Sequence, residues 1–300
     1  MDPKEESVAI SEKRKRSEEL SRLCRPRISL ENDISDTSYL YRVIHQTTGG
    51  LGGNASPGSS MYGELRKGSM DQIIDVMVSK CELSRQSRFI DIGSGLGKPS
   101  FHVACRVECE LSYGIENAFI RQHLCMMNLI AVLSEEIITS MIGFQLCDAL
   151  ELTNIEPFTH VFQFDLAFPP NLLYNIADAF NASRTAKYLI CFHKQDAVLE
   201  YGFRVRLLAQ FMTHLSGSNE GHTCYFYVKE DVDANIVTPV HFAASLDQCH
   251  IDPIFKTSID KYKLENWSTS VIENAKNDIA GFLNGGRPVR KRRPSSTNSY

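Results

Sequence analysis

One stretch decides the fold: Arg88-Phe89-Ile90-Asp91-Ile92-Gly93-Ser94-Gly95-Leu96-Gly97-Lys98. A short apolar run leads directly into three alternating glycines, and an acid stands two residues ahead of the first. Glycine suits such a turn because a side chain would clash with the tight backbone and keep it away from a ligand. The stretch therefore predicts a nucleotide-binding turn between a strand and a helix.

The glycine spacing distinguishes between cofactors. A dinucleotide fingerprint needs its third glycine at position 98, which holds Lys98. The pattern instead consists of Asp91, Gly93, Gly95 and Gly97. It resembles the first motif of the Rossmann-like, class I S-adenosylmethionine-dependent methyltransferases. Glu116 ends the next apolar run, roughly twenty residues on, where a carboxylate accepts hydrogen bonds from ribose hydroxyls.

Length and composition limit the class of protein. The 300 residues are 43% hydrophobic, enough for the core of one large or two small domains. We expect neither a membrane span nor a secretion signal, since no run of about 18 apolar residues occurs and the N-terminus is charged. The nine cysteines include no Cys-x-x-Cys pair, which favours reduced thiols over a zinc site.

The charge is unevenly distributed. The net charge is −4, but five of the seven residues 287–293 are basic, and without them 27 basic residues face 36 acidic ones. We expect the core to repel nucleic acid. The basic tail, and more weakly residues 13–16, are candidates for nuclear import or nucleic-acid contact; the alternative is a solvated, disordered end.

Short apolar strands alternate with helical patterns, which predicts an α/β fold with a mostly parallel, doubly wound sheet. The expected helices are 69–78, opened by a capping box at Ser69, then 98–105, 118–133, 172–180 and 270–283. The expected strands are 88–92, 111–115, 144–147, 160–166 and 187–192. Residues 204–215 and 222–228 predict a closing antiparallel hairpin, as class I methyltransferases typically have.

Four regions are expected along the chain. Residues 1–60 form a mobile N-terminal arm and a glycine-rich loop, 61–230 the methyltransferase core, 231–284 a C-terminal appendage, and 285–300 a basic disordered tail. Within the first region, residues 39–45 are apolar enough to dock on the core. The glycine-rich residues 49–60 are either a linker or a lid over a ligand.

Two further acids follow predicted strands. Asp148 is placed to accept a hydrogen bond from the adenine amino group, and Asp165 lies next to the reactive methyl. Asp165-Leu166-Ala167-Phe168-Pro169-Pro170 resembles the motif of amino-group methyltransferases, but Phe168 precedes the prolines, so the adenine-modifying class loses support.

A closer resemblance appears when Met61-Tyr62-Gly63-Glu64, Asp91 to Gly97, Gly114-Ile115-Glu116, Asp148 and Leu166-Ala167-Phe168 are taken together. Over residues 61–228 the chain resembles the disruptor-of-telomeric-silencing family, histone lysine methyltransferases without a SET domain, and is similar to its compact protist members. That family modifies a lysine on the folded core of histone H3 in the nucleosome.

The resemblance implies a set of functional residues. Cofactor contacts are expected at Tyr62, Gly63, Glu64, Leu65, Asp91, Gly93, Ser94, Gly95, Gly97, Lys98, Glu116, Asn117, Asp148, Ala149 and Asp165. In the family the Tyr-Gly-Glu segment closes over the methionine part of the cofactor, which favours a lid at residues 49–65. Three positions depart from the family: Lys98 stands for Gln, Asn117 for Lys and Asp165 for Asn.

The chemistry requires a neutral lysine amine, although a free lysine has a pKa of about 10.4. An apolar aromatic channel disfavours the ammonium. Its candidates are Phe168 and, on the hairpin, either Tyr225 with Tyr227 or Phe226, since alternate residues face opposite sides of a strand. Asp165 is a further candidate, as an acceptor of the proton.

The remaining polar residues are interpreted as structural. His193 and Lys194 are possible substrate or catalytic contacts, but a surface pair is the favoured interpretation. His102, His123, His160 and His214 lack the spacing of metal ligands. The leading hypothesis is a nuclear histone lysine methyltransferase whose basic ends hold nucleosomal DNA. The alternatives are a class I methyltransferase acting on RNA or another protein, and a catalytically silent chromatin-binding module.

Overall fold

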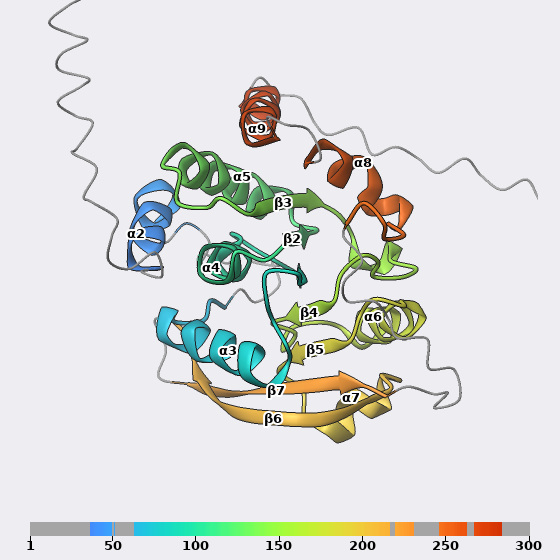
Figure 1. Ribbon diagram of the computed structural model, residues 1–300. Coiled ribbons are helices and arrows are strands. Elements are labelled where there is room, and N and C mark those ends of the chain that lie inside the picture. The colour runs from blue at the N-terminus through green and yellow to red at the C-terminus, as the bar shows by residue number, and fades with distance from the viewer. Residues whose placement is uncertain are drawn as a thin grey trace, which may run out of the picture. The chain divides into compact units, whose positions relative to one another are not determined.

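The computed structural model describes residues 37–49, 51, 63–216, 220–230, 246–262 and 267–283. Seven strands form one sheet in the order β3-β2-β1-β4-β5-β7-β6 (Figure 1). They are β1 (Arg88–Ile92), β2 (Leu111–Glu116), β3 (Met141–Leu146), β4 (His160–Gln163), β5 (Tyr188–Cys191), β6 (Val205–His214) and β7 (Gly221–Lys229). β1 to β5 are parallel, and β7 runs antiparallel to β5 and β6. The predicted doubly wound sheet with its closing hairpin is confirmed.

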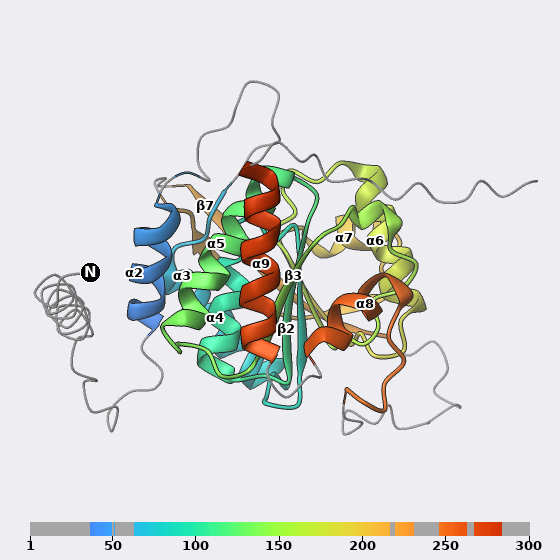
Figure 2. The ribbon, with the colours of Figure 1, turned by 90° about the horizontal axis from the view of Figure 1, so that it is seen from above.

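Helices cover both faces of the sheet. One face carries α3 (Lys67–Lys80), α4 (Lys98–Val107) and α5 (Phe119–Ser134); the other carries the 3-10 turn η2 (Ala149–Glu151), α6 (Pro170–Ala182), α7 (Gln195–Glu200) and α8 (Pro253–Tyr262) (Figure 1). Two helices lie further out: α2 (Thr37–Thr48), which packs on α4 and α5, and α9 (Trp267–Leu283), which lies along α5 (Figure 2). Among the described helices, none is long and apolar enough to cross a membrane.

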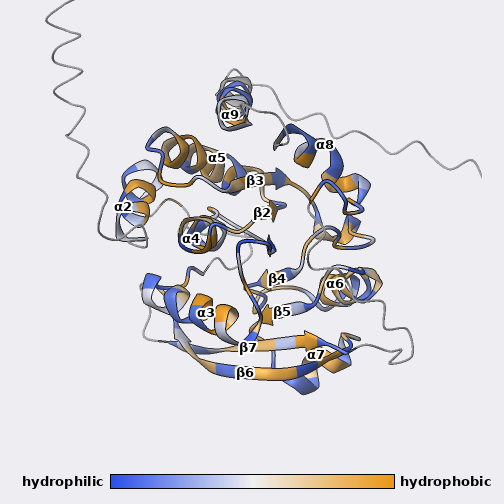
Figure 3. Ribbon diagram, in the orientation of Figure 1, coloured by the Kyte–Doolittle hydropathy of each residue, from blue (hydrophilic) through white to orange (hydrophobic). Residues whose placement is uncertain are grey.

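Burial explains the composition of the strands. Every residue of β1, β2, β4 and β5 is buried, as expected for parallel strands covered on both faces. Alternate residues of a strand point to opposite faces of the sheet. Phe89 and Phe162 stack on the face covered by α3, with ring centroids 6.1 Å apart, whereas Tyr113 contacts Phe255 of α8 on the opposite face. In Figure 3, α2 and α3 carry both colours, as amphipathic covering helices should.

The predicted docking of residues 39–45 is confirmed by α2. Leu40 and Ile44 are fully buried, and the Thr48 hydroxyl donates a hydrogen bond to the Asn128 side chain of α5 at 3.0 Å. The N-terminal arm, most of the glycine-rich loop, Tyr62 and the basic tail lie outside the described residues.

Three local predictions are corrected. The capping box at Ser69 is wrong: α3 begins at Lys67, and the Ser69 hydroxyl instead accepts a hydrogen bond from the backbone N–H of His214 at 3.0 Å. The fourth strand ends at Gln163 rather than at Leu166, because the chain turns there to bring Asp165 back towards β5. Helix α8 lies in sequence too weakly periodic to predict it.

Candidate functional site

The turn after β1 has the conformation that the glycines predicted. Gly93, Gly95 and Gly97 have φ angles of +79°, +55° and +83°, in the left-handed region that glycine tolerates best. The backbone N–H groups of Gly93 and Ser94 both donate to the Ile115 carbonyl of β2 at 2.9 Å. Gly97 then caps α4, whose first turn contains Pro99, so the helix N-terminus points its free amides towards the turn.

Neighbouring elements pack closely on this turn. A Cβ on Gly97 would lie 2.7 Å from both Cys125 Sγ of α5 and Phe144 Cζ of β3. A Cβ on Gly93 would lie 2.8 Å from Cζ of Phe168, in the loop between β4 and α6. The turn is therefore in close contact with α5, with β3 and with the loop that contains Phe168. Phe168 also lies near the expected reaction centre.

Asp91 and Ser94 carry buried polar atoms that no described residue satisfies. Asp91 is 2% exposed, and its Oδ2 and the Ser94 hydroxyl lack hydrogen-bond partners within the described part of the chain. Burial, with the nearby Glu116 carboxylate as a second cause, raises the pKa of Asp91 well above its usual value. Such atoms are normally paired, so their convergence at the end of β1 fits a polar ligand.

Glu116 braces the turn from the end of β2. Its Oε2 accepts from the Gly95 N–H at 2.9 Å, and its Oε1 accepts from the Ala118 N–H at 2.7 Å and from Arg121 at 3.0 Å. A carboxylate offers about four acceptor positions, so one remains for a ribose hydroxyl. The adjacent Asn117 is exposed.

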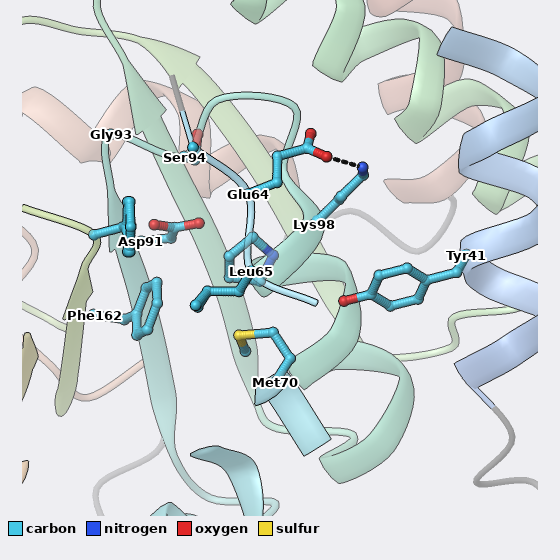
Figure 4. Close-up of a pocket in the computed structure, with 12 residues that line it drawn as sticks. Tyr41, Glu64, Leu65, Met70, Asp91, Gly93, Ser94, Lys98 and Phe162 are labelled. Carbon is cyan, nitrogen blue, oxygen red and sulfur yellow. Dashed lines mark hydrogen bonds and ion pairs between the residues drawn. The ribbon is translucent and has the colours of Figure 1, made fainter. Parts of the chain in front are cut away.

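A pocket lies beside the turn, on the α3 side of the sheet. It is lined by Tyr41, Gly63, Glu64, Leu65, Met70, Asp91, Gly93, Ser94, Lys98, Pro99, Phe162 and Phe164. In Figure 4, Asp91 lies near Gly93 and Phe162, and Glu64 forms an ion pair with Lys98. Seven residues expected to contact the cofactor thus share one cavity, and all of them precede residue 99.

The segment before α3 is tied to the closing hairpin. The Ser216 N–H donates to the Glu64 carbonyl at 2.7 Å, and the Arg66 N–H donates to the His214 carbonyl at 3.0 Å. Leu65 forms an isolated bridge with Leu215 between these bonds. This fixes Gly63, Glu64 and Leu65 over the pocket, beside the place expected for a lid.

Tyr41 is a pocket residue that the sequence did not single out. It comes from α2, and its hydroxyl lies 3.0 Å from Nδ1 of His102, whose Nε2 lies 3.0 Å from Asp71. Burial lowers the pKa of His102 to about 4, so the ring is neutral and bridges α2, α4 and α3. This fits the structural role predicted for His102. No spacing in the sequence connects Tyr41 with the turn.

Asp148 and Ala149 follow β3 at the same edge of the sheet. Asp148 is half-buried, and its Oδ1 accepts from the Leu150 N–H at 3.1 Å, which caps η2. Ala149 is buried at 8% exposure. One oxygen of Asp148 therefore holds the loop, while the second is available for the predicted adenine contact.

Asp165 is fixed from three directions. It is 1% exposed; Oδ1 accepts from the Phe192 N–H at 2.9 Å, and Oδ2 accepts from the Gln163 side chain at 2.9 Å. Nδ1 of His193 lies 3.0 Å from the same Oδ2, in a bent arrangement. The favoured interpretation of His193 as a surface pair with Lys194 is therefore wrong, because its partner is a buried carboxylate 28 positions earlier in the chain.

The register of β7 decides between the two hairpin alternatives. Tyr225 pairs with Cys191 and Tyr227 with Leu189, and the two tyrosine rings stack 6.2 Å apart. The Tyr227 hydroxyl donates to the His193 carbonyl at 2.9 Å. Phe226 instead faces the α3 side, fully buried and stacked on Phe211 at 5.6 Å. Phe226 is a core residue. On the opposite side of the strand Tyr227 is also fully buried, so the half-buried Tyr225 is the hairpin residue that remains a channel candidate.

The other titratable groups are structural. Nε2 of His160 lies 2.7 Å from the Cys81 carbonyl, and burial lowers the pKa of this histidine to about 4. Burial raises the pKa of Cys81 and Cys109 to about 12, so these thiols stay protonated. Across the described residues, no group of three or more His, Cys, Asp or Glu side chains has the arrangement of a metal site.

Sheet order and site together define the class. The order 3-2-1-4-5-7-6 with one antiparallel strand, a glycine turn after β1 and an acid after β2 are those of the class I S-adenosylmethionine-dependent methyltransferases. Residues 41–148 match the family model described as histone methylation protein DOT1. The resemblance to the disruptor-of-telomeric-silencing family is confirmed over this part of the chain, which runs from α2 through Asp148.

Several solved structures are similar to part of this chain in their backbone trace. Magnesium protoporphyrin IX methyltransferase from Synechocystis, with bound S-adenosylmethionine, is 15% identical with a TM-score of 0.44, over 67% of this chain and 100% of that one. A putative RNA methyltransferase from Pyrococcus horikoshii is 14% identical with a TM-score of 0.44, over 65% and 100%. TrmK from M. capricolum, with S-adenosylhomocysteine, is 10% identical with a TM-score of 0.42, over 75% and 100%. No curated protein sequence matches the chain.

Proposed function

We propose that this protein is a histone lysine N-methyltransferase that transfers a methyl group from S-adenosylmethionine to a lysine in the globular core of nucleosomal histone H3. The observation that carries the proposal is the match of residues 41–148 to a histone methylation family, because this match contains the glycine turn and the buried Asp91. A nuclear location and a nucleosomal partner belong to the same proposal.

The residues present fit the cofactor. Unpartnered Asp91 Oδ2 and the Ser94 hydroxyl suit the amino-acid end, the spare acceptor of Glu116 suits the ribose, and Asp148 suits the adenine amino group. S-adenosylmethionine supplies an electrophilic methyl group on a sulfonium. Gly63, Glu64 and Leu65 line the pocket beside the place proposed for the methionine part, and Glu64 pairs there with Lys98.

The reaction side of the site is aromatic. Phe168 covers the turn, while Tyr225 and Tyr227 lie on the sheet face that carries Asp165 and His193. An environment poor in water disfavours the ammonium form of lysine and so favours the nucleophilic amine. The basic ends of the chain hold nucleosomal DNA through phosphate contacts.

A transfer assay tests the proposal. Radiolabelled S-adenosylmethionine is offered with intact nucleosomes, free core histones or total RNA, beside a Gly95→Arg variant that blocks the turn. The expected result is label on nucleosomal histone H3, absent with the variant, and peptide mapping then gives the lysine. Label on RNA or on another protein would keep the class and reject the substrate.

The alternative that is not an enzyme is a chromatin-binding module that keeps the fold but has no catalytic activity. Its discriminating measurement is calorimetry with S-adenosylmethionine: a methyltransferase binds and is stabilised against thermal unfolding. The absence of both heat and stabilisation would favour the silent module.

A further inference from the structure

His193 and Asp165 form a pair at the end of β5 that no part of the family resemblance accounts for. The buried carboxylate and the 21% exposed imidazole lie 3.0 Å apart. The pair stands beside Phe168, whose N–H donates to the Asp165 carbonyl at 3.0 Å and whose ring covers Gly93. The pair is therefore connected with the glycine turn through Phe168.

We propose that His193 accepts the proton that the substrate ammonium must lose, and that Asp165 positions its ring. This rests on the proposed function, since it names the proton acceptor of that reaction. In the step, an N–H bond of the ammonium breaks, the electron pair stays on nitrogen, and the proton bonds to Nε2 of His193. The amine's electron pair would then form the new bond to the methyl carbon, while the carbon–sulfur bond of the sulfonium breaks and its electron pair stays on sulfur.

The hydrogen bonds assign the two roles. Both oxygens of Asp165 already accept bonds, from the Phe192 N–H and from Gln163, so this carboxylate is held as an orienting group. A carboxylate beside Nδ1 keeps the proton on that nitrogen and leaves Nε2 as the acceptor. The imidazole of His193 is held from its other side by the aromatic contact described next.

A line of aromatic rings leads from the surface to this histidine. Tyr174 of α6 is 47% exposed and meets Tyr201 edge-on at 5.4 Å, and Tyr201 meets the His193 ring edge-on at 5.7 Å. Aromatic walls admit the apolar stem of a long amine while disfavouring its charged end. Aromatic side chains therefore border His193 between the exposed Tyr174 and the buried Asp165.

The titratable groups around His193 come from four elements. They are Asp165 in the loop after β4, Tyr225 and Tyr227 on β7, Tyr174 on α6, Tyr201 after α7, and Lys194 with Asp196 at the start of α7. The Asp165 carboxylate, 3.0 Å from Nδ1, raises the pKa of His193, against the effect of burial. Lys194 is 69% exposed and pairs with Asp196 at 3.8 Å, so solvent screens its charge.

The test compares His193→Gln with wild type by methyl transfer to nucleosomes across pH, with His45→Gln on the exposed face of α2 as the matched control. We expect kcat of His193→Gln to be lower by about 10²- to 10⁴-fold at neutral pH. The deficit should shrink towards pH 10, because the substrate lysine then loses its proton unaided. A deficit that is the same at every pH would overturn the proton-acceptor role.

A second readout does not depend on turnover. In NMR titrations the His193 ring should show a raised pKa in the wild type, and Asp165→Asn should lower it. An unchanged titration would overturn the positioning role of Asp165. If the wild type transfers no methyl group to nucleosomes, histones or RNA, the proposed function fails and the role of His193 with it; a pH profile unaffected by His193→Gln in an active enzyme rejects this inference alone.

Discussion

Asp91 is a buried acid whose surroundings raise its pKa. Its carboxyl group is buried, one oxygen lacks a partner among the described residues, and the nearest charge is another carboxylate, Glu116. Burial and like charge both favour the protonated form. The folded protein therefore favours the protonated form of Asp91 more than the unfolded chain does, where the pKa is about 3.9.

This gives a pH dependence with a definite sign. Because the folded pKa is raised, the stability that Asp91 contributes is complete below about pH 3.9 and is lost as pH rises towards the folded pKa. The Asp91→Asn variant has a side chain of nearly the same shape but no carboxyl group that can titrate. We expect it to match the wild type in denaturant unfolding at pH 4, to exceed it at pH 8, and to weaken S-adenosylmethionine binding in calorimetry.

The neighbouring Ser94→Ala is the matched control, since it removes an unpartnered hydroxyl that does not titrate in this range. Its difference in unfolding free energy from the wild type should be the same at pH 4 and pH 8. An Asp91→Asn difference that is equally independent of pH would show that Asp91 is ionised in the folded protein.

Gly97 permits a second test at a single residue. Gly97→Ala places a methyl group 2.7 Å from Cys125 and Phe144 at a φ of +83°, so strain of roughly 1–2 kcal/mol adds to overpacking of roughly 1–3 kcal/mol. Gly202→Ala has a φ of +93° with nothing within 4 Å, and so reports the backbone strain alone. In chemical denaturation, Gly97→Ala should lose more stability than Gly202→Ala; equal losses would reject the packing argument.

At the scale of elements, β7 separates core from reaction chemistry by the alternation of its side chains. Phe226→Ala removes a fully buried ring from the α3 side and should cost about 3–5 kcal/mol in unfolding free energy. Tyr225→Ala, one position away, removes a half-buried ring from the Asp165 side. It should cost on the order of 1–2 kcal/mol and instead lower methyl transfer.

Chemical denaturation and the transfer assay, run on both β7 variants, check this assignment. A Tyr225→Ala protein with full transfer activity would remove β7 from the substrate channel. A Phe226→Ala protein of normal stability would contradict the core position of its ring.

The elements that the sequence predicted are those whose signal is local. The glycine turn, the docked α2 and the hairpin of β6 and β7 each follow from periodicity or turn residues within a short window. The capping box at Ser69 failed because its hydroxyl has a better partner in His214, which lies 145 positions later in the chain. Helix α8 buries only a short apolar face, centred on Phe255 and Ile259. Its position depends on contacts of Phe255 with Tyr113 and Phe158, which are far away in the sequence.

The candidate site divides in the same way. The pocket residues from Gly63 to Lys98 belong to contiguous motifs, so the sequence identified nearly all of them. Tyr41 and His193 were not assigned, because their importance comes from contacts with His102 and Asp165 on other elements. Single-chain patterns do not contain such pairings.

Over the described part of the molecule, the functional groups gather where the parallel strands end. Asp91 and Glu116 lie at the ends of β1 and β2, and the loops after β3, β4 and β5 contain Asp148, Asp165 and His193 respectively. All five stand at the carboxyl edge, where open α/β sheets bind their ligands. Because acidic side chains do not attract phosphates, we do not expect this edge of the sheet to bind DNA. Any grip on nucleosomal DNA then depends on basic residues outside this edge.

The five basic residues within 287–293 are the candidates for that grip. Deleting residues 287–300 should weaken nucleosome binding at low salt and flatten the plot of log K against log salt by up to about 4.5, roughly 0.9 for each phosphate that the tail no longer neutralises. Deleting only residues 294–300 removes no basic residue and is the matched control. Binding by electrophoretic mobility shift at several salt concentrations measures both slopes, and calorimetry with S-adenosylmethionine should give the same Kd for all three proteins. If the longer deletion keeps the full salt slope, the tail does not hold DNA, and nucleosome recognition must come from protein contacts near the carboxyl edge of the sheet.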